Sequence, residues 1–520
     1  MAEEILPKIS KIFSITLISI LDKLRKAFAS GVTKPVEWRK QQLRQLLTGI
    51  QEMKIQMTTA IEKDLGKSPF VTEVTSIQPC LWDIEFSLSH VDEFVKDISL
   101  DTPMMFAPSS TQIRYEPLGV VMIYGSWNYP FVVTLKPLCQ AITSGNCALI
   151  KPSELAPHSS RVIKDLVNNY LDKSCFDVIE GGPEVAIEAQ KYQFDLICFT
   201  GSTQKGKLVA EAAGRFLTPC ILELGGKCPA IIDESANIEL AAAKISFARF
   251  NNSGQTCICT DYVLVHDSVK DQFVDRIKSK LRDHYGDDPN GNPHMGKVIT
   301  EWHCDRLKNL IETSQGKILC GGTVKKDIKY VEPTIILNPK KDSPVMEEEI
   351  FGPILPILTF SKIEEVVDFI NSKDKPLAVY YFGKYFRNPN RDKIMDTTTS
   401  GAFVQNDVLI HMINHEFGFG GVGGSGYGRY GGYEGFKAWS NPKSVMYRPA
   451  LNFYPLNAFS PPFTPERQVQ LRKLMKMSGT QNKTIKIVVW ILVLLTIAIL
   501  IGTLHSQIYH GIQDGCRNII

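Results

Sequence analysis

One cysteine of this chain lies in a segment whose residue types suit nucleophilic catalysis. Residues 251–257 read Asn-Asn-Ser-Gly-Gln-Thr-Cys, so the thiol of Cys257 follows small and amide-bearing residues. Such a loop can hold a thiol at the floor of a cleft, with backbone N–H groups directed at the atom that the sulfur attacks. A thiol is a weak nucleophile until its pKa falls or a base takes its proton, and a single cysteine is more often a small buried apolar residue. The prediction of a catalytic thiol therefore depends on the other motifs of the chain.

Several other short motifs supply groups that could complete such a site, although each is weak by itself. In chain order they are residues 125–131 (GSWNYPF), 151–154 (KPSE), 199–203 (FTGST), 222–227 (LELGGK), 348–353 (EEIFGP) and 406–407 (ND). A lone glutamate is more often a capping or salt-bridged surface residue. Glu223, however, stands between two leucines and before Gly225 and Gly226, which favours a position in a cleft.

Residues 421–426 satisfy the glycine pattern G-x-G-x-x-G, but their context argues against a dinucleotide loop. That pattern binds a pyrophosphate only between a strand and a helix of a βαβ unit, and no such pair flanks this segment. We interpret it as a tight loop near the substrate entrance.

The motifs lie beside short apolar segments that are typical of buried strands. The predicted strands are residues 119–125, 147–151, 176–179, 195–199, 229–232 and 262–265. Helices are predicted between them, including 159–170 and 237–250, and residues 36–96 have helical spacing before them. Strands that alternate with helices of this size form parallel sheets covered on both faces. The sequence therefore predicts an α/β protein with two lobes.

In this order, the motifs resemble those of the aldehyde dehydrogenase superfamily over about residues 21–449. The segments that look most like its class 3 branch, which includes the membrane-anchored fatty aldehyde dehydrogenases, are residues 126–131, 217–219, 261–262 and 419–423. The resemblance implies the aldehyde dehydrogenase fold. That fold has a Rossmann-like cofactor lobe, an α/β catalytic lobe and a small oligomerisation element, here followed by a C-terminal transmembrane helix.

The resemblance also implies a role for each reactive group. Cys257 would attack the aldehyde carbon as a thiolate, and the side-chain amide of Asn128 with the Cys257 N–H would stabilise the oxyanion. Hydride transfer to a nicotinamide would leave a thioester. Glu223, 34 residues before Cys257, would activate the water that hydrolyses it.

By the same resemblance, six residues would hold the cofactor: Lys151, Glu154, Gly201, Ser202, Glu349 and Phe351. Lys151 and Glu154 would bind the adenosine ribose, and a helix that starts near Ser202 would approach the pyrophosphate. NAD is the expected cofactor because Glu154 would repel a 2′-phosphate, with NADP as the alternative that the class 3 branch tolerates. Tyr129 and Asn406 resemble substrate-side positions, and no metal site is predicted.

The C-terminus contains the clearest membrane signal of the chain. Residues 487–504 carry no charge, and a helix of that length spans about 27 Å, enough for a thin bilayer. Basic residues crowd its N-terminal side, which predicts a tail anchor with the catalytic domain in the cytosol. The endoplasmic reticulum is the expected membrane, with the peroxisome or the mitochondrial outer membrane as alternatives.

These observations divide the chain into seven predicted parts. They are an amphipathic helical extension (1–21), a cofactor domain (22–225, with 100–116 in oligomerisation), a catalytic domain (226–434), an oligomerisation segment (435–465), a basic amphipathic linker helix (466–486), the anchor (487–504) and a short tail (505–520). A homodimer is expected by resemblance.

Composition narrows the function classes. A net charge of +3 is too small to suggest nucleic-acid binding, and the twelve cysteines show no C-x-x-C pattern, so reduced thiols facing the cytosol are expected. The predicted function is NAD(P)-dependent oxidation of medium- and long-chain aliphatic aldehydes to fatty acids at a membrane. Two alternatives stay open: a coenzyme A-acylating aldehyde dehydrogenase and a non-catalytic scaffold of the same fold.

Overall fold

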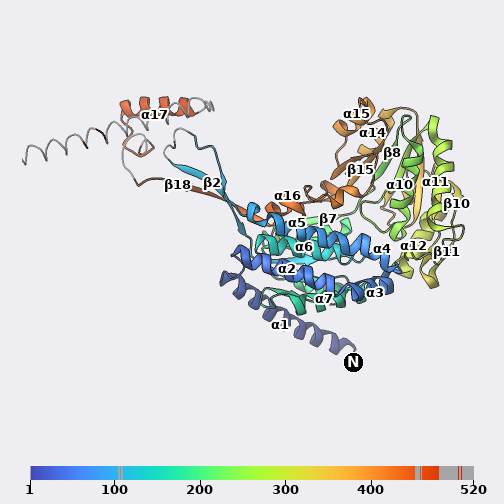
Figure 1. Ribbon diagram of the computed structural model, residues 1–520, viewed down its shortest axis with the longest axis horizontal. Coiled ribbons are helices and arrows are strands. Elements are labelled where there is room, and N and C mark those ends of the chain that lie inside the picture. The colour runs from blue at the N-terminus through green and yellow to red at the C-terminus, as the bar shows by residue number, and fades with distance from the viewer. Residues whose placement is uncertain are drawn as a thin grey trace, which may run out of the picture. The chain divides into compact units, whose positions relative to one another are not determined.

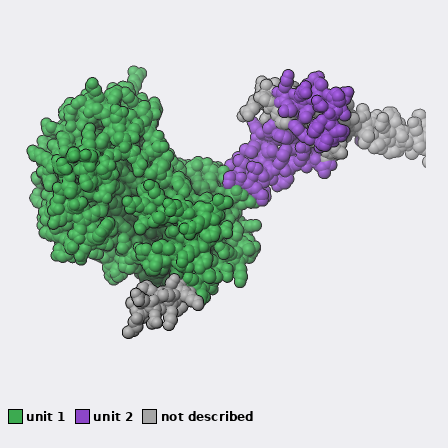
Figure 2. Space-filling view, turned by 180° about the vertical axis from the view of Figure 1, so that it is seen from behind, with its two compact units in different colours: residues 1–96, 115–441 green, residues 97–114, 442–520 purple. Residues whose placement is uncertain are grey.

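The computed structural model of the chain describes residues 2–103, 106, 109–450, 457, 459–478, 502 and 505. It contains two compact units (Figure 2): unit 1 comprises Met1–Lys96 and Tyr115–Asn441, and unit 2 comprises Asp97–Arg114 and Pro442–Ile520. The predicted anchor, residues 487–504, lies outside the described residues apart from Gly502. Among the helices that the structure does describe, none has the length and apolar character needed to cross a bilayer.

Unit 1 begins with a set of helices that cover the cofactor lobe (Figure 1). They are α1 (Ala2–Ala29), α2 (Val36–Glu52), α3 (Lys54–Leu65), α4 (Pro69–Thr72), the π-helix η1 (Glu73–Ile77) and α5 (Gln78–Phe94). Helix α1 is longer than the predicted extension 1–21, because its apolar stripe continues. Leu17, Leu21 and Leu24 recur at helical spacing and are all buried against the core.

The cofactor lobe is built on a six-stranded sheet in the order β17-β7-β6-β3-β4-β5. Its strands are β3 (Val120–Tyr124), β4 (Cys147–Lys151), β5 (Phe176–Val178), β6 (Leu196–Gly201), β7 (Cys220–Leu224) and β17 (Gly426–Tyr427). The crossover helices are α6 (Val132–Ser144), α7 (Pro157–Tyr170), α8 (Pro183–Ala189) and α9 (Thr203–Gly214). All strands but β17 are parallel, and the strand order reverses at β3, which pairs with both β4 and β6. This is the Rossmann-like arrangement that binds ligands at the carboxyl ends of its strands.

The catalytic lobe is built on a seven-stranded sheet in the order β10-β13-β14-β9-β8-β15-β16, in which β10 alone is antiparallel to its neighbour. The strands are β8 (Pro229–Ile232), β9 (Tyr262–His266), β10 (Lys317–Cys320), β13 (Thr334–Leu337), β14 (Ile354–Phe360), β15 (Ala378–Phe382) and β16 (Ala402–Gln405). Its helices are α10 (Ile238–Phe250), α11 (Lys270–Tyr285), α12 (Glu301–Glu312), α13 (Pro344–Glu347), α14 (Ile363–Asn371) and α15 (Pro389–Thr397). Helix α16 (Gly432–Ala438) packs instead on α5 and α6 of the cofactor lobe.

Both faces of this second sheet are apolar because alternate residues of each strand point to opposite sides. Ala230 and Ile232 pack with α10 and α11, whereas Ile231 packs with α12, α14 and α15. The two parallel sheets with helices on both faces agree with the predicted α/β fold.

The described residues of unit 2 include a small antiparallel sheet and the helix α17 (Pro465–Ser478). A three-stranded sheet has the order β1-β2-β18, with β1 (Ile98–Ser99), β2 (Ser110–Pro117) and β18 (Ser440–Tyr447), and β2 and β18 both begin or end in unit 1. Helix α17 lies where the basic linker helix 466–486 is predicted, and residues 479–486 lie outside the described residues.

Candidate active site

The site residues lie where the carboxyl ends of the cofactor-sheet strands meet the amino ends of the catalytic-sheet strands. The motifs that contain Gly125, Ser202 and Gly225 follow the carboxyl ends of β3, β6 and β7. The Cys257 loop and the segment of residues 348–353 instead precede the amino ends of β9 and β14. The chain therefore brings the carboxyl edge of the cofactor sheet to the amino edge of the catalytic sheet.

The cysteine loop has an unusual backbone that explains its small residues. Asn252, Ser253 and Gly254 all have positive φ angles, of 55°, 51° and 70°. Asparagine and glycine adopt this region at low cost, and a Cβ at position 254 would overlap the carbonyl of Gly352. Gln255 then braces the turn by donating to Asn252 O and Lys297 O, at 2.9 Å each. The loop holds Cys257 half-buried at its end.

Asn128 is tied directly to this loop. Its Oδ1 accepts a hydrogen bond from Ser126 Oγ at 2.6 Å, which orients the amide, and its Nδ2 donates to Gln255 O at 3.1 Å. An amide nitrogen has two N–H groups, so one can hold the loop while the other is directed at an oxyanion. Tyr129 is linked to the same loop, because its hydroxyl lies 3.0 Å from Thr256 Oγ1.

Glu223 sits in β7, opposite Gly426 of β17, and is 2% exposed. Neither carboxylate oxygen has a hydrogen-bond partner among the described residues. Burial raises the pKa of Glu223 well above its usual range, and the charge of Arg429 offsets part of this effect. A buried carboxylate without partners, with a raised pKa, is typical of a group that exchanges a proton with a bound reactant.

The glycine-rich segment 421–426 packs against β7 and does not form a nucleotide-binding loop. It forms a 3-10 turn (Gly423–Ser425) followed by β17, and a Cβ at position 426 would overlap the carbonyl of Leu222. Glycine is thus required there for close pairing with β7.

The surroundings of Cys257 favour its thiol form over the thiolate. Burial raises its pKa well above the usual range, and the charges of Glu223 and then Glu349 raise it further. A base or an electrostatic change on ligand binding is therefore needed to form the thiolate.

This arrangement predicts the pH dependence of thiol alkylation. We expect the rate at which iodoacetamide modifies Cys257 to rise with pH, with a midpoint above that of an ordinary cysteine, because only the thiolate reacts and burial raises the pKa of Cys257. Glu223→Gln should move the midpoint to lower pH, since it removes a negative charge that disfavours the thiolate. Mass spectrometry of the Cys257 peptide measures both rates. A midpoint that stays in place in the variant would show that the two groups are not coupled.

Glu349 lies against the two glycines that follow β7. It accepts a hydrogen bond from the Gly226 N–H, and a Cβ on Gly225 would overlap its Oε2. Burial, and next the charge of Asp261, raise the pKa of Glu349 to about 8. The adjacent Phe351 has a positive φ of 48°, and its ring packs edge-on against Trp127 with centroids 5.4 Å apart.

The remaining predicted cofactor residues lie at the carboxyl edge of the cofactor sheet. Lys151, buried at the end of β4, donates from Nζ to Glu154 Oε2 at 2.9 Å and to Pro152 O at 3.3 Å. Gly201 ends β6, and Ser202 caps α9 by accepting a hydrogen bond from Lys205 N. A cation beside a carboxylate can bind ribose hydroxyls, and the free N–H groups of a capped helix can bind a pyrophosphate. The residues present therefore fit a nicotinamide dinucleotide.

The side-chain amide of Asn406 makes its hydrogen bonds to the residue after β15 and not to the cysteine loop. Asn406 follows β16 at the carboxyl edge of the catalytic sheet, whereas Cys257 precedes the amino end of β9. Both ends of its side-chain amide bind the backbone of Gly383, at 3.0 Å each. In this structure Asn406 connects the ends of β15 and β16.

Sequence reasoning did not identify the burial of four charged residues around the site, Lys67, Lys227, Arg249 and Asp261. Lys67 is fully buried, with its ammonium 4.4 Å from the centroid of the Tyr129 ring, and burial lowers the pKa of Lys67 to about 7. The available signal was weak, because a charged residue beside apolar segments is usually solvated.

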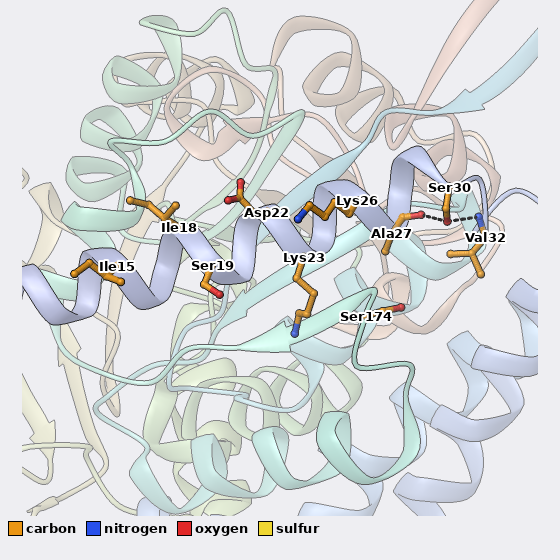
Figure 3. Close-up of a pocket in the computed structure, with 10 residues that line it drawn as sticks. All are labelled: Ile15, Ile18, Ser19, Asp22, Lys23, Lys26, Ala27, Ser30, Val32 and Ser174. Carbon is orange, nitrogen blue, oxygen red and sulfur yellow. Dashed lines mark hydrogen bonds between the residues drawn. The ribbon is translucent and has the colours of Figure 1, made fainter.

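A separate open groove lies along α1 (Figure 3). Its lining includes Lys23, which pairs with Asp177 at 2.6 Å, and contains none of the predicted site residues. The groove therefore has no part in the chemistry described above.

The fold and the site together define a class of protein, a dehydrogenase that joins a Rossmann-like lobe to a catalytic lobe with a cysteine loop. The family model described as "Aldehyde dehydrogenase family" matches residues 3–445. The chain belongs to the aldehyde dehydrogenase family and is an oxidoreductase that acts on aldehydes. The predicted family is confirmed.

Relatives narrow the branch and the cofactor. The chain is 39% identical to "Aldehyde dehydrogenase family 3 member A2" of Rattus norvegicus over 402 residues, which cover 77% of this chain and 82% of that protein. The structure titled "Substrate bound state of Staphylococcus Aureus AldH" has a TM-score of 0.84 and 37% identity, covering 88% of this chain and 98% of that one. PnpE in complex with nicotinamide adenine dinucleotide has a TM-score of 0.76 and 26% identity, covering 84% and 90%. Members of the family use NAD(P), which confirms the predicted cofactor class.

Proposed function

We propose that the protein oxidises medium- and long-chain aliphatic aldehydes to fatty acids at a membrane surface, through a thioester on Cys257. The observation that carries the proposal is the meeting of three groups at one junction between the sheets. These groups are the half-buried Cys257 thiol, the Asn128 amide bound to its loop, and the buried Glu223 carboxylate without a partner.

Each side chain has a distinct task in the first half of the reaction. The Cys257 thiolate attacks the aldehyde carbon, and the aldehyde oxygen gains a negative charge. The Asn128 amide and the Cys257 N–H are fixed by the braced loop before the charge develops, and one such donor contributes about 3 kcal/mol to the transition state. NAD(P), when bound, accepts the hydride that leaves this carbon, and the acyl group then remains on Cys257 as a thioester.

Glu223 serves the second half of the reaction. Its carboxylate takes a proton from a water molecule as that water attacks the thioester carbon. The carbon–sulfur bond breaks, the fatty acid leaves, and the thiol is restored. A raised pKa suits this task, because the carboxylate is a stronger base than an exposed glutamate.

For the cofactor, we propose NAD bound by Lys151, Glu154, Gly201, Ser202, Glu349 and Phe351. Glu154 is held beside Lys151, where its charge favours a free ribose hydroxyl over a 2′-phosphate. NADP is the alternative, and titration of the reduced-cofactor signal with each nucleotide distinguishes the two. We propose that Tyr129 contributes to substrate binding. Asn406 would contribute less directly, through the loop after β16.

One assay can distinguish this function from the two alternatives, a coenzyme A-acylating enzyme and a non-catalytic scaffold. A coenzyme A-acylating enzyme would not need a base at Glu223, and a scaffold would not keep the three reactive groups together. Purified protein with hexadecanal and NAD, followed by the absorbance of the reduced cofactor, tests all three. Turnover without coenzyme A supports the proposal, dependence on coenzyme A supports the acylating enzyme, and no turnover with any aldehyde supports a scaffold.

The membrane part of the proposal comes from the C-terminal region. Residues 487–504 have the composition of a tail anchor, and the preceding helix α17 carries four basic residues. In α17, Val469 and Met475 are exposed, so apolar side chains accompany its basic ones. We propose a tail-anchored protein with a cytosolic catalytic domain, with the endoplasmic reticulum as first choice.

Truncation tests this arrangement. A chain that ends at Lys486 should leave membranes yet keep the turnover of short, soluble aldehydes, because it retains the whole site. Removing residues from Glu466 onward should further weaken hexadecanal turnover in detergent if α17 guides long chains, each CH₂ of which partitions by about 0.8 kcal/mol. Initial rates with a short and a long aldehyde measure the difference. Equal losses for both would leave α17 as a connecting helix only.

We further propose a homodimer in which residues 102–112 and the segment after Gly435 supply the contact. β18 is an edge strand of the sheet β1-β2-β18, so it offers backbone groups that a second chain could extend. Light scattering on the chain that ends at Lys486 would give the mass of a dimer.

A further inference from the structure

The segment of residues 348–352, which carries Glu349 and Phe351, is held mainly by charged side chains. It lies between α13 and β14 and is outside regular secondary structure. Lys227 donates to Glu348 O at 3.0 Å, Arg306 donates to Glu349 O at 3.3 Å and also to Ile350 O, and Arg249 donates to Gly352 O. Three cations thus bind four of its five carbonyls.

Asp261 connects two of these cations to the segment. Its Oδ2 accepts from Lys227 Nζ at 2.6 Å, and its Oδ1 accepts from Arg249 Nη1 at 3.1 Å and from the Ile350 N–H at 3.2 Å. Asp261 is 2% exposed and Arg249 is fully buried. Hereafter the clamp means Asp261 with Lys227, Arg249 and Arg306.

The clamp also contacts the cysteine loop. Arg249 lies in the last turn of α10, two residues before the loop, and its Nη1 donates to Cys259 Sγ at 2.8 Å and to Thr260 O at 3.1 Å. Gly254 packs so closely on Gly352 that a Cβ there would overlap the Gly352 carbonyl. The loop that presents the thiol and the segment that presents Glu349 therefore share one set of contacts.

Stability alone is a poor reason for such an arrangement. Buried ion pairs repay little more than the cost of removing their charges from water, and apolar residues of similar volume often serve as well. Charged side chains can, however, donate hydrogen bonds to several backbone carbonyls at once and so fix the position of a segment. The geometry therefore points to placement of the segment as the task of the clamp.

We propose that Asp261 is a positioning residue that fixes Glu349 and Phe351 relative to Cys257. Cofactor-dependent oxidation then requires the clamp, whereas cofactor-independent acyl chemistry at Cys257 does not. The inference rests on the proposed roles of these site residues.

A cofactor-free reaction separates the two activities. The Cys257 thiolate attacks p-nitrophenyl acetate, the sulfur–acyl bond forms, the ester C–O bond breaks, and p-nitrophenolate leaves. Water then hydrolyses the thioester with the help of Glu223, which yields acetate and restores the thiol. This reaction uses the catalytic thiol and base but neither Glu349 nor Phe351.

The test compares Asp261→Asn with Arg306→Ala and a control. Arg306 binds the same segment but is partly exposed. Arg306→Ala should therefore fold even if Asp261→Asn, which changes a buried carboxylate, does not. The control, Asp233→Asn, removes another buried carboxylate that hydrogen-bonds Ser235 and Asn390 beyond the carboxyl end of β8. Full-length protein is used throughout.

In both clamp variants we expect the KM for NAD and its calorimetric Kd to rise about 10-fold and the oxidation kcat to fall, since small misplacements of reacting groups cost this much or more. Ester hydrolysis should stay within about 2-fold, and Asp233→Asn should leave the KM for NAD unchanged. Parallel loss of oxidation and ester hydrolysis, or an unchanged KM and Kd for NAD in Arg306→Ala, would overturn the inference. Wild-type protein that binds NAD but oxidises no aldehyde would refute the proposed function instead, while the shift in Kd still tests the clamp.

Discussion

Cys257→Ser should lower the rate of aldehyde oxidation by about 10³-fold or more while leaving NAD affinity nearly unchanged. The serine hydroxyl keeps the shape of the thiol, but its pKa is far higher, so it is a far weaker nucleophile at the position of Cys257. The contacts of Lys151, Glu154 and Ser202 are separate from the thiol, so cofactor binding should persist. The absorbance of reduced cofactor gives the rate, and calorimetry with NAD gives the affinity.

A matched control is available in the same lobe. Cys320, on β10, is half-buried like Cys257 but lies on the edge strand of the catalytic sheet. Cys320→Ser should keep the oxidation rate within about 2-fold. If Cys257→Ser retained a substantial part of the wild-type rate, the nucleophile would have to be another group.

Glu223→Gln should separate the two halves of the reaction. The amide keeps the volume of the carboxylate but cannot accept a proton, so thioester hydrolysis should slow by about 100-fold or more. Hydride transfer precedes that step and should continue. Stopped-flow absorbance should then show a burst of reduced cofactor about equal to the enzyme concentration, followed by a slow steady state.

The alternative base is Glu349, which is also buried and has a raised pKa. Glu349→Gln should raise the KM for NAD and show no burst, because its carboxylate lies against Gly225 and Gly226 on the cofactor side. If Glu223→Gln kept normal steady-state turnover and Glu349→Gln showed the burst, Glu349 would be the base for hydrolysis and Glu223 would not.

The sequence predicted the parts of the fold and of the site that depend on local chemistry. Strands such as Val120–Tyr124 are apolar throughout because both faces of a parallel sheet are covered, so their positions could be predicted. The loop before Cys257 was predicted from its small and amide-bearing residues, and among them asparagine and glycine suit the positive φ angles at positions 252 and 254. The motifs, in their order, also sufficed to predict the family.

Only the tertiary structure decided which of these parts meet. Cys257, Asn128 and Glu223 come together because the carboxyl edge of one sheet faces the amino edge of another, which no local pattern encodes. Asn406 matches a family motif yet binds Gly383 at the opposite edge of its sheet. Residues 261–262 look like the class 3 branch, but that resemblance assigns Asp261 no role, and its three partners are separated from it in the chain by 12 to 89 residues. Burial and hydrogen bonding are properties of such distant neighbours, so the task of a buried charge becomes visible only when the folded chain supplies its partners.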